Sequence, residues 1–216
     1  MQRKILVTGF DPFGGEPVNP AFEVLRFLKG KTLAGHIVAT QEIPTVRHKS
    51  IEVLKSAIKR EDPALVVSIG QAGGRLDITP ERVAINVDDF RIPDNEGNRP
   101  TGEPIVGNGP AAYFTRLPVK AMVRAMAEAG IPASLSNTAG TFVCNHIFYG
   151  LMHMLETEGG IRRGGFIHIP YMTSQAARLG KQPSMSVETI ASGLEIAILT
   201  AIETDEDIKA VGGEIH

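Results

Sequence analysis

The sequence predicts an α/β fold in which a mostly parallel β-sheet is covered by helices on both faces. Short apolar runs rich in β-branched residues alternate along the chain with longer segments whose apolar residues recur at helical spacing. The short runs are continuously apolar, as expected for strands that are buried on both faces. The length of 216 residues suits one domain of this class.

The predicted strands are short and separated by longer segments. The first is Ile5-Leu6-Val7, which follows two basic residues. The run at 165–169 is stopped by Pro170, because proline has no backbone N–H to donate to a sheet. The remaining strands are predicted at 36–40, 64–69 and 133–136, and the last is the weakest of the set.

Five helices are predicted between and after these strands. In the second, Ile51, Leu54 and Ile58 share one face. In the fourth, which begins near residue 143 and ends at Gly159-Gly160, apolar residues recur at steps of four. The other three helices are expected at 20–29, 118–129 and 187–202, and the second covers 46–60.

Residues 93–109 interrupt the alternation. They are rich in Gly, Pro, Asn and Asp, so they predict an excursion that is either a lid or a β-arm. The tail from 205 to 216 is acidic and then contains glycine, and we expect it to be loose. No linker or repeat divides the chain, which predicts a single domain over residues 1–216.

Composition excludes several classes of function. The 22 basic and 24 acidic residues give a net charge of −2, which does not favour binding to nucleic acid or to an anionic membrane. No apolar run approaches the roughly 20 residues of a membrane span, and the first residues lack the apolar stretch of a signal peptide. One cysteine cannot form an intrachain disulfide. Together these features predict a soluble, cytoplasmic protein.

The single cysteine, Cys144, is the first candidate for chemistry. It follows the small residues Ala139-Gly140-Thr141 at the start of a predicted helix. The unpaired N–H groups and dipole at a helix N-terminus favour the thiolate, the nucleophilic form of sulfur. A lone cysteine is more commonly a small buried hydrophobic residue. Covalent catalysis therefore requires a histidine and an orienting acid within reach.

His168 and Glu81 are candidates for these two partners. His168 lies near the C-terminal end of a predicted strand, at the sheet edge where ligands of open α/β sheets bind. Glu81 follows a strand and a glycine turn, and a carboxylate there could orient an imidazole. An isolated histidine is more often a core residue. A single glutamate more often forms a surface ion pair, here with Arg75 or Arg82.

Other motifs are absent or incomplete. The segment from Thr8 to Gly15 lacks the Gly-Lys pair of a phosphate-binding loop, and no dinucleotide or nucleophile-elbow pattern occurs. His146 and His153 have no spacing typical of zinc ligands. We therefore expect no metal and no cofactor.

Phe10 and Phe13 are candidates for an apolar pocket wall, or for ordinary core packing.

Two segments resemble the glutamate and cysteine signatures of pyroglutamyl peptidase type I, also called pyrrolidone carboxyl peptidase. They are residues 70–86, from Gly70-Gln71-Ala72 to Ile85-Asn86, and residues 136–145, from Ser136-Asn137 to Cys144-Asn145. The segments Val7 to Gly15 with Asn19-Pro20, and Phe166 to Pro170, are also similar to that family. The blocks occur in the family's order over nearly the whole chain.

The resemblance implies a cysteine omega-peptidase that removes N-terminal 5-oxoproline from peptides without a cofactor. It implies a three-layer α/β/α sandwich around a mostly parallel twisted sheet, a cytosolic location and, as in many members, a homotetramer. It assigns Cys144 as nucleophile, His168 as general base and acid, and Glu81 as the residue that orients His168. The Cys144 N–H and Arg91 become oxyanion donors. The implied substrate-binding residues are Phe10, Phe13, Asn19, Gln71, Phe142 and Val143.

Two rival functions stay open on the sequence alone. One is an α/β protein that binds a small lactam or a nucleoside-like ligand without turnover. The other is a cysteine amidase that acts on a different cyclic acyl group. Covalent labelling of Cys144 with release of product separates the first rival from the peptidase, and a comparison of pyroglutamyl, prolyl and glutaminyl substrates separates the second.

Overall fold

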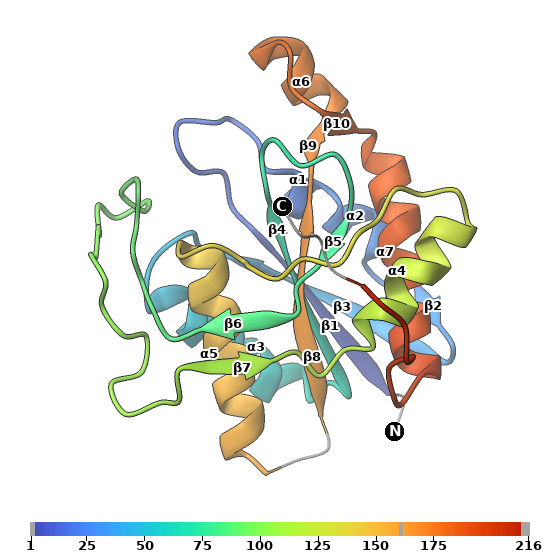
Figure 1. Cartoon of the computed structure of the whole chain (residues 1–216), viewed down its shortest axis with the longest axis horizontal. Coiled ribbons are helices and arrows are strands. Elements are labelled where there is room, and N and C mark those ends of the chain that lie inside the picture. Colours follow the sequence, from blue (N-terminus) through green and yellow to red (C-terminus); the bar gives the residue numbers. More distant parts are fainter. Residues whose placement is uncertain (1–2, 160–161, 213–216) are drawn as a thin grey trace.

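A six-stranded sheet forms the centre of the computed structural model, which describes residues 3–159 and 162–212 (Figure 1). Four parallel strands form its middle: β3 (His36–Ile43), β1 (Lys4–Phe10), β4 (Leu65–Gln71) and β8 (Arg163–Ile169). Each edge carries a short antiparallel strand, β2 (Thr32–Leu33) beside β3 and β5 (Thr79–Pro80) beside β8. The predicted mostly parallel sheet is confirmed.

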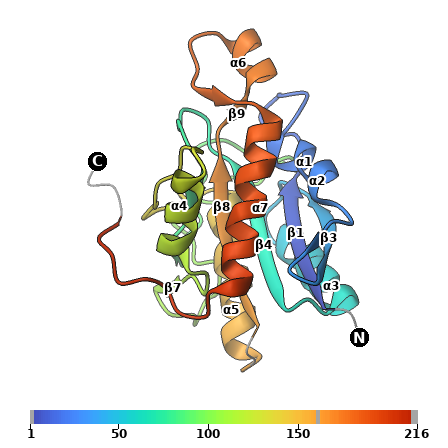
Figure 2. The same ribbon diagram turned by 90° about the vertical axis from the view of Figure 1, so that its right-hand side faces the viewer.

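Helices cover both faces of this sheet (Figure 2). Helices α3 (Lys49–Glu61) and α5 (Val143–Thr157) pack on one face, where Leu54, Ile147 and Phe166 belong to one buried apolar cluster. A second cluster covers the other face and joins it to α1 (Pro20–Glu23), α2 (Leu25–Leu28), α4 (Val119–Glu128) and α7 (Val187–Glu203). The three layers agree with the predicted α/β/α sandwich.

The register of β4 against β8 determines which residues meet near the end of the sheet. Gly70 pairs with His168, and Ser68 pairs with Phe166. Side chains alternate between the faces along a strand, so Phe166 and His168 point to the same face. Phe166 packs in the cluster under α5, which identifies that face as the one covered by α3 and α5.

Several predicted elements differ from the structure. The prediction of a strand at 133–136 is wrong: this segment makes only two isolated bridges, Ile78 to Ala133 and Glu81 to Ser136. The predicted helix at 20–29 is two short helices that meet at Val24. The helix predicted from residue 46 begins at Lys49, because His48 has a positive φ of 59° that no α-helix contains. The predicted helix end at Gly159-Gly160 lies partly outside the described residues, and α5 ends at Thr157.

The excursion at 93–109 is a loop between two strands of a separate antiparallel ribbon. This ribbon consists of β6 (Val83–Ile85) and β7 (Ala112–Phe114), and the loop extends from it in Figure 1. Beyond β8, a second small sheet of β9 (Tyr171–Met172) and β10 (Ser184–Met185) flanks α6 (Thr173–Leu179). Sequence periodicity is too weak in such short elements to predict them.

The C-terminal tail is more closely attached than its composition suggests. The Asp207 carboxylate accepts hydrogen bonds from the backbone N–H groups of Lys120 and Ala121, in the first turn of α4. The Arg82 guanidinium donates to the carbonyl of Gly212 at 2.6 Å. The part of the tail up to residue 212 is therefore attached to the domain, and residues 213–216 lie outside the described chain.

Candidate active site

Cys144 occupies the first turn of α5. The helix begins at Val143, and Phe142 is its N-cap in an extended conformation. Cys144 is partly accessible, and its Sγ lies only 3.0 Å from the position that a Cβ on Gly70 would take. The thiol therefore rests against the β4 backbone at a point where only glycine leaves room for it.

His168 and Glu81 are joined by a direct hydrogen bond. The imidazole Nδ1 lies 2.7 Å from the Glu81 Oε1. Glu81 is fully buried and His168 is 4% exposed. Because Nδ1–H donates to the carboxylate, the ring presents its unprotonated Nε2 on the opposite side. The pair has the geometry of a base and its orienting acid.

The sheet places Cys144 beside this pair. The thiol contacts the position of Gly70, and Gly70 is the register partner of His168 on the adjacent parallel strand. Neighbouring strands lie about 4.8 Å apart, and paired residues of parallel strands point to the same face. The Sγ of Cys144 and the imidazole of His168 thus share one face of the sheet at neighbouring strand positions.

Burial outweighs the helix N-terminus in setting the protonation state of Cys144. Loss of solvation and the negative charge of Glu81 raise the pKa of the thiol to about 12, although Arg75 and a backbone N–H act in the opposite direction. The N-terminus of α5 favours the thiolate, as the sequence indicated, but loss of solvation at the sulfur acts more strongly in the opposite direction.

The His168–Glu81 pair is shifted in a complementary way. Burial lowers the pKa of His168 more than the Glu81 hydrogen bond raises it, so the imidazole is neutral near pH 7. Burial alone would raise the pKa of Glu81. The hydrogen bond and charge of His168, and the charge of Arg75, outweigh that effect and lower the pKa of this carboxyl, which is therefore ionised.

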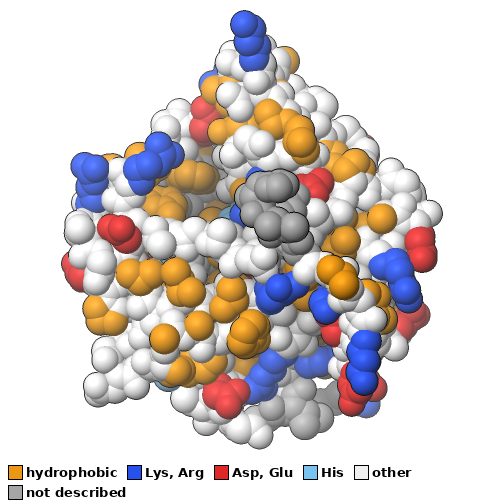
Figure 3. Space-filling model, in the orientation of Figure 1, with side chains coloured by type: hydrophobic (Ala, Val, Ile, Leu, Met, Phe, Trp, Pro, Cys, Tyr) orange, Lys and Arg blue, Asp and Glu red, His pale blue; other side chains and the backbone are white. Residues whose placement is uncertain are grey.

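Aromatic side chains surround the start of α5. The Phe142 ring packs against Phe90 and Phe13, with centroid distances of 4.7 and 5.9 Å. Phe13 and Phe142 are partly exposed, whereas Phe10 and Val143 are buried in the core beneath α5. In Figure 3, hydrophobic side chains gather in a hollow on this face of the molecule. Of the four residues expected to line an apolar substrate pocket, only Phe13 and Phe142 are therefore exposed enough to contact a ligand.

The two amide side chains expected at the site already have partners. Asn19 is the N-cap of α1: its Oδ1 accepts from the Ala21 N–H, and its Nδ2 donates to the Asp11 carbonyl. Gln71 directs its side chain to the face opposite Cys144, where its Oε1 accepts from Gln175 at 3.0 Å. In these positions Asn19 holds the loop that carries Phe13, and Gln71 borders the sheet end.

Arg91 lies at the rim of this region. Its side chain is exposed, and its carbonyl accepts a hydrogen bond from Arg99. The preceding residue, Phe90, packs against Phe142. The guanidinium therefore extends from a segment that is fixed beside the Cys144 loop.

Arg75 also belongs to the site. Its Nη1 lies 2.6 Å from the Glu81 Oε1, the same oxygen that accepts from His168, and it also contacts the Thr79 hydroxyl. Its Nη2 donates to the carbonyl of Thr138, in the loop before Cys144. The sequence suggested Arg75 only as a partner for Glu81 in a surface ion pair. The ion pair exists, but its carboxylate is fully buried.

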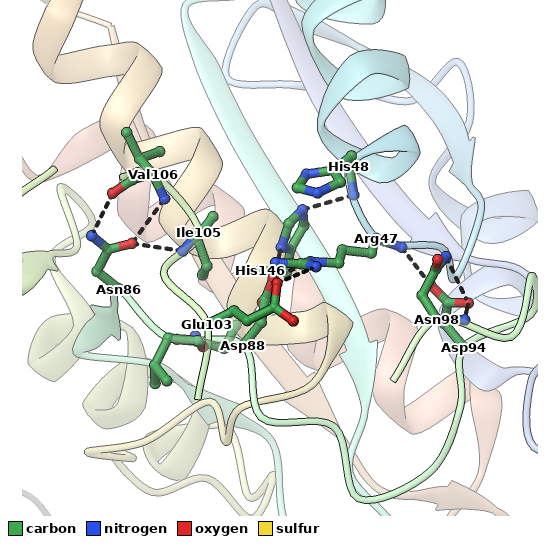
Figure 4. A network of polar contacts seen from close by, with 12 residues as sticks. Arg47, His48, Asn86, Asp88, Asp94, Asn98, Glu103, Ile105, Val106 and His146 are labelled. Atoms are coloured by element: carbon green, nitrogen blue, oxygen red, sulfur yellow. Dashed lines mark hydrogen bonds and ion pairs between the residues drawn. The ribbon is translucent and has the colours of Figure 1, made fainter. Parts of the chain in front are cut away.

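A second buried network joins α5 to the 86–109 segment (Figure 4). His146 Nδ1 donates to the Asp88 carboxylate at 2.8 Å, and Asp88 also accepts from Arg47 Nε. His146 Nε2 accepts from the backbone N–H of His48. His146 is two residues after Cys144, so the network holds the first turns of α5. No pattern of spacing in the sequence indicated it.

The described residues offer no metal centre: within 3–159 and 162–212, no three His, Cys, Asp or Glu side chains gather as metal ligands do. Among the helices of the same residues, none combines the length and apolar character that a membrane crossing needs.

Comparisons with known proteins identify the family of this chain. A family model described as pyroglutamyl peptidase matches residues 3–204. A pyrrolidone-carboxylate peptidase of Bacillus mycoides is 55% identical over 99% of this chain and 100% of its own, and one of Bacillus anthracis is also 55% identical with the same coverage.

Solved structures give the same result. The pyroglutamyl peptidase I of Bacillus amyloliquefaciens superposes with a TM-score of 0.95 at 50% identity, covering 98% of this chain and 100% of that one. A mutant pyrrolidone carboxyl peptidase of Pyrococcus furiosus gives 0.89 at 41% identity, covering 93% and 98%. The match spans the cysteine loop, the histidine strand and the buried glutamate alike, and the chain belongs to the pyroglutamyl peptidase family.

Proposed function

We propose that this chain removes an N-terminal pyroglutamyl residue from peptides, with Cys144 as nucleophile, His168 as general base and acid, and Glu81 as the residue that orients His168. The observation that carries the proposal is the placement of a neutral imidazole, bonded through Nδ1 to Glu81 at 2.7 Å, on the strand position paired with Gly70, against which the Cys144 thiol rests. The named relatives are all peptidases, so nothing favours a binder without turnover.

In the first half-reaction, the thiol loses its proton as it attacks. His168 Nε2 takes the proton from Cys144 Sγ while the sulfur bonds to the pyroglutamyl carbonyl carbon. Because burial raises the pKa of the thiol, we propose that this transfer accompanies attack rather than preceding it. The carbonyl oxygen becomes an oxyanion. His168 then gives the proton to the amine nitrogen as the C–N bond breaks, which leaves a thioester.

In the second half-reaction, water replaces the amine. His168 takes a proton from water, the resulting hydroxide attacks the thioester carbonyl, and the C–S bond breaks. The proton returns to sulfur, and pyroglutamate leaves. Glu81 keeps its charge throughout and stabilises the imidazolium that forms twice in each cycle.

The oxyanion needs hydrogen-bond donors at the start of α5. The backbone N–H of Cys144 lies in the first turn, where helix N–H groups have no partner within the helix. Arg91 is the second donor that we propose, extending from the segment beside Phe142. Donors fixed in this way stabilise the charge that develops in the transition state.

Selectivity follows from the neutrality of the substrate ring. The pyroglutamyl lactam is uncharged, and the partly exposed Phe13 and Phe142 offer it an apolar surface. Phe10 and Val143 support these walls from below. We propose that Gln71 and Asn19 border the lactam, Gln71 from the end of β4 and Asn19 from the loop that carries Phe13, with their amide side chains bonded to Gln175 and to the α1 cap. An ordinary N-terminal ammonium is rejected, because removing water from an unpaired charge is costly.

The test is the cleavage of a chromogenic pyroglutamyl anilide by the purified protein, beside prolyl and glutaminyl anilides. We expect turnover of the pyroglutamyl substrate alone, loss of turnover in Cys144→Ala, and inactivation by iodoacetamide in step with alkylation at Cys144. Mass spectrometry of the intact protein reads alkylation directly, since the chain has one cysteine. Turnover by Cys144→Ala would contradict the mechanism.

Two further properties belong to this proposal. We expect the enzyme to act in the cytoplasm and to assemble as a homotetramer. Exposed apolar side chains such as Phe114 on β7, 70% exposed, and Leu76, 74% exposed, are the kind of surface that contacts between copies cover.

A further inference from the structure

We propose that Arg75 is a positioning residue for catalysis: its guanidinium fixes the buried Glu81 carboxylate and ties the Glu81–His168 pair to the loop that precedes Cys144. This inference rests on the proposed function and extends it to a residue outside the three proposed catalytic groups. Arg75 acts through Glu81 and the Thr138 loop, and no contact with substrate is required of it.

The first support is the geometry of the guanidinium. One nitrogen, Nη1, contacts Glu81 Oε1 at 2.6 Å and the Thr79 hydroxyl, and the other, Nη2, donates to the Thr138 carbonyl at 3.0 Å. The planar fork of arginine holds these directions relative to one another, which a lysine cannot do. Arg75 thus connects the 79–81 segment to the loop before Cys144, and the relative placement of these two segments sets the distance from imidazole to sulfur.

The second support is the state of the carboxylate. Glu81 is fully buried, and the direct hydrogen bonds that it accepts from His168 and from Arg75 both end on Oε1. The side chain of Ser136 also helps to lower the pKa of this carboxyl. Without Arg75, the buried carboxylate would lose its charged donor and would be oriented by neutral groups alone.

The third support is charge balance around the sulfur. Arg75 comes from the turn after β4, Glu81 from the segment after β5, His168 from β8 and Cys144 from α5. The charge of Glu81 raises the pKa of the thiol, and the charge of Arg75 lowers it. Removing Arg75 would take away the positive charge that opposes Glu81 and make the thiol harder to ionise.

A groove gives access to Arg75 from outside. It has a volume of about 640 Å³ and is lined by Arg75, Asp77, Thr79 and the 132–138 segment. Truncation of Arg75 would open a space continuous with this groove. A free guanidinium ion can therefore enter and replace the missing group.

The decisive measurement is the rate of alkylation of Cys144 by iodoacetamide at fixed pH, beside steady-state kinetics. For Arg75→Ala we expect alkylation several-fold slower than in the wild type, kcat lower by about tenfold or more, and KM changed little. The acid limit of kcat/KM moves to higher pH, because Glu81 without Arg75 raises the pKa of His168. Guanidinium chloride at tens of millimolar restores part of kcat.

Two variants complete the test. Arg75→Lys keeps the charge without the fork, so we expect a thiol alkylation rate near that of the wild type but a reduced kcat. Arg82→Ala is the matched control, because Arg82 follows Glu81 in sequence and donates to Gly212 in the tail. We expect Arg82→Ala to behave as the wild type does.

The outcomes are distinguishable. If the wild type does not cleave the pyroglutamyl anilide, the proposed function fails. If the wild type turns over and Arg75→Ala matches it in kcat, the positioning role is overturned. If Arg75→Ala loses activity but Cys144 is alkylated faster than in the wild type, the thiol has become more exposed. Arg75 would then have a structural role only, and the positioning role is again overturned.

Discussion

At the scale of single residues, burial sets the chemistry of the site. It keeps the Cys144 thiol protonated, with a pKa of about 12, and it lowers the pKa of His168 so that the imidazole is free to act as a base. In the mechanism that we propose, such a neutral pair ionises while the sulfur attacks the carbonyl carbon.

The pH dependence of kcat/KM follows from these shifts. The acid limit reports protonation of His168 in the free enzyme, and its lowered pKa places the midpoint below about 6.5, the ordinary value for histidine. No rise is expected through pH 8–9, where an ordinary thiol ionises. Steady-state kinetics with a pyroglutamyl anilide, which does not titrate in this range, measure kcat/KM across the acid limit and through pH 8–9. A rise through pH 8–9 would contradict the neutral pair.

Gly70 provides a second prediction at this scale. A Cβ there would lie 2.7 Å from the Phe166 ring and 3.0 Å from Cys144 Sγ. Gly70→Ala should therefore lower the free energy of unfolding by about 1–3 kcal/mol and reduce kcat by displacing the sulfur. Gly107→Ala is the control, since its Cβ would meet no atom within 4 Å. Urea denaturation and steady-state kinetics measure both effects, and equal behaviour of the two variants would contradict the packing argument.

At the scale of elements, the residues after Cys144 attach α5 to the segment that leads to Arg91. The Asn145 side chain bonds to the backbone of Ile85 and Val87. His146 bonds to the Asp88 carboxylate (Figure 4). Arg47, two residues before the start of α3, bonds to Asp88 and to Glu103 in the loop at 93–109. The helix that presents the thiol and the segment that carries Arg91 are thus fixed relative to each other.

Breaking this network should be costly. Asp88→Asn leaves Arg47 and His146 without their shared carboxylate, and we expect a loss of about 3–5 kcal/mol in the free energy of unfolding. Glu96→Gln removes an exposed ion pair with Lys49 and should change the free energy of unfolding little, because water and salt screen exposed charges. Chemical denaturation of both variants compares them. A loss in Asp88→Asn no larger than that of Glu96→Gln would show that the network does not hold the segment.

At the scale of the whole molecule, strand order assembles the site. The order β2-β3-β1-β4-β8-β5 places β8 next to β4, although about ninety residues separate them in sequence. The segment between them contains β5 with Glu81 directly after it, the 93–109 loop, and α5 with Cys144 in its first turn. Most of the proposed site therefore comes from one long insertion between two adjacent parallel strands.

The proposed tetramer is also a property of this scale. Light scattering coupled to size exclusion should give a mass about four times the 23.2 kDa of one chain. A mass equal to one chain at micromolar concentration would contradict it.

The sequence by itself determined the fold class and the proposed catalytic residues. The main strands and the helices at 118–129, 143–159 and 187–202 were predictable within a few residues, because each buries a long apolar face with a clear period. Cys144, His168 and Glu81 were recognisable because they lie where strands end or a helix begins, within blocks that resemble a known family.

Only the tertiary structure decided how these groups behave. The pKa of Cys144 depends on desolvation by segments distant in sequence, which outweighs the local helix N-terminus. The contacts of Arg75, and the His146–Asp88 network, join residues whose spacing has no pattern. Helices and strands can be predicted from the sequence because each produces a repeating pattern of apolar residues. Burial and long-range hydrogen bonds arise only when the sheet brings separate segments together, and no sequence pattern records them.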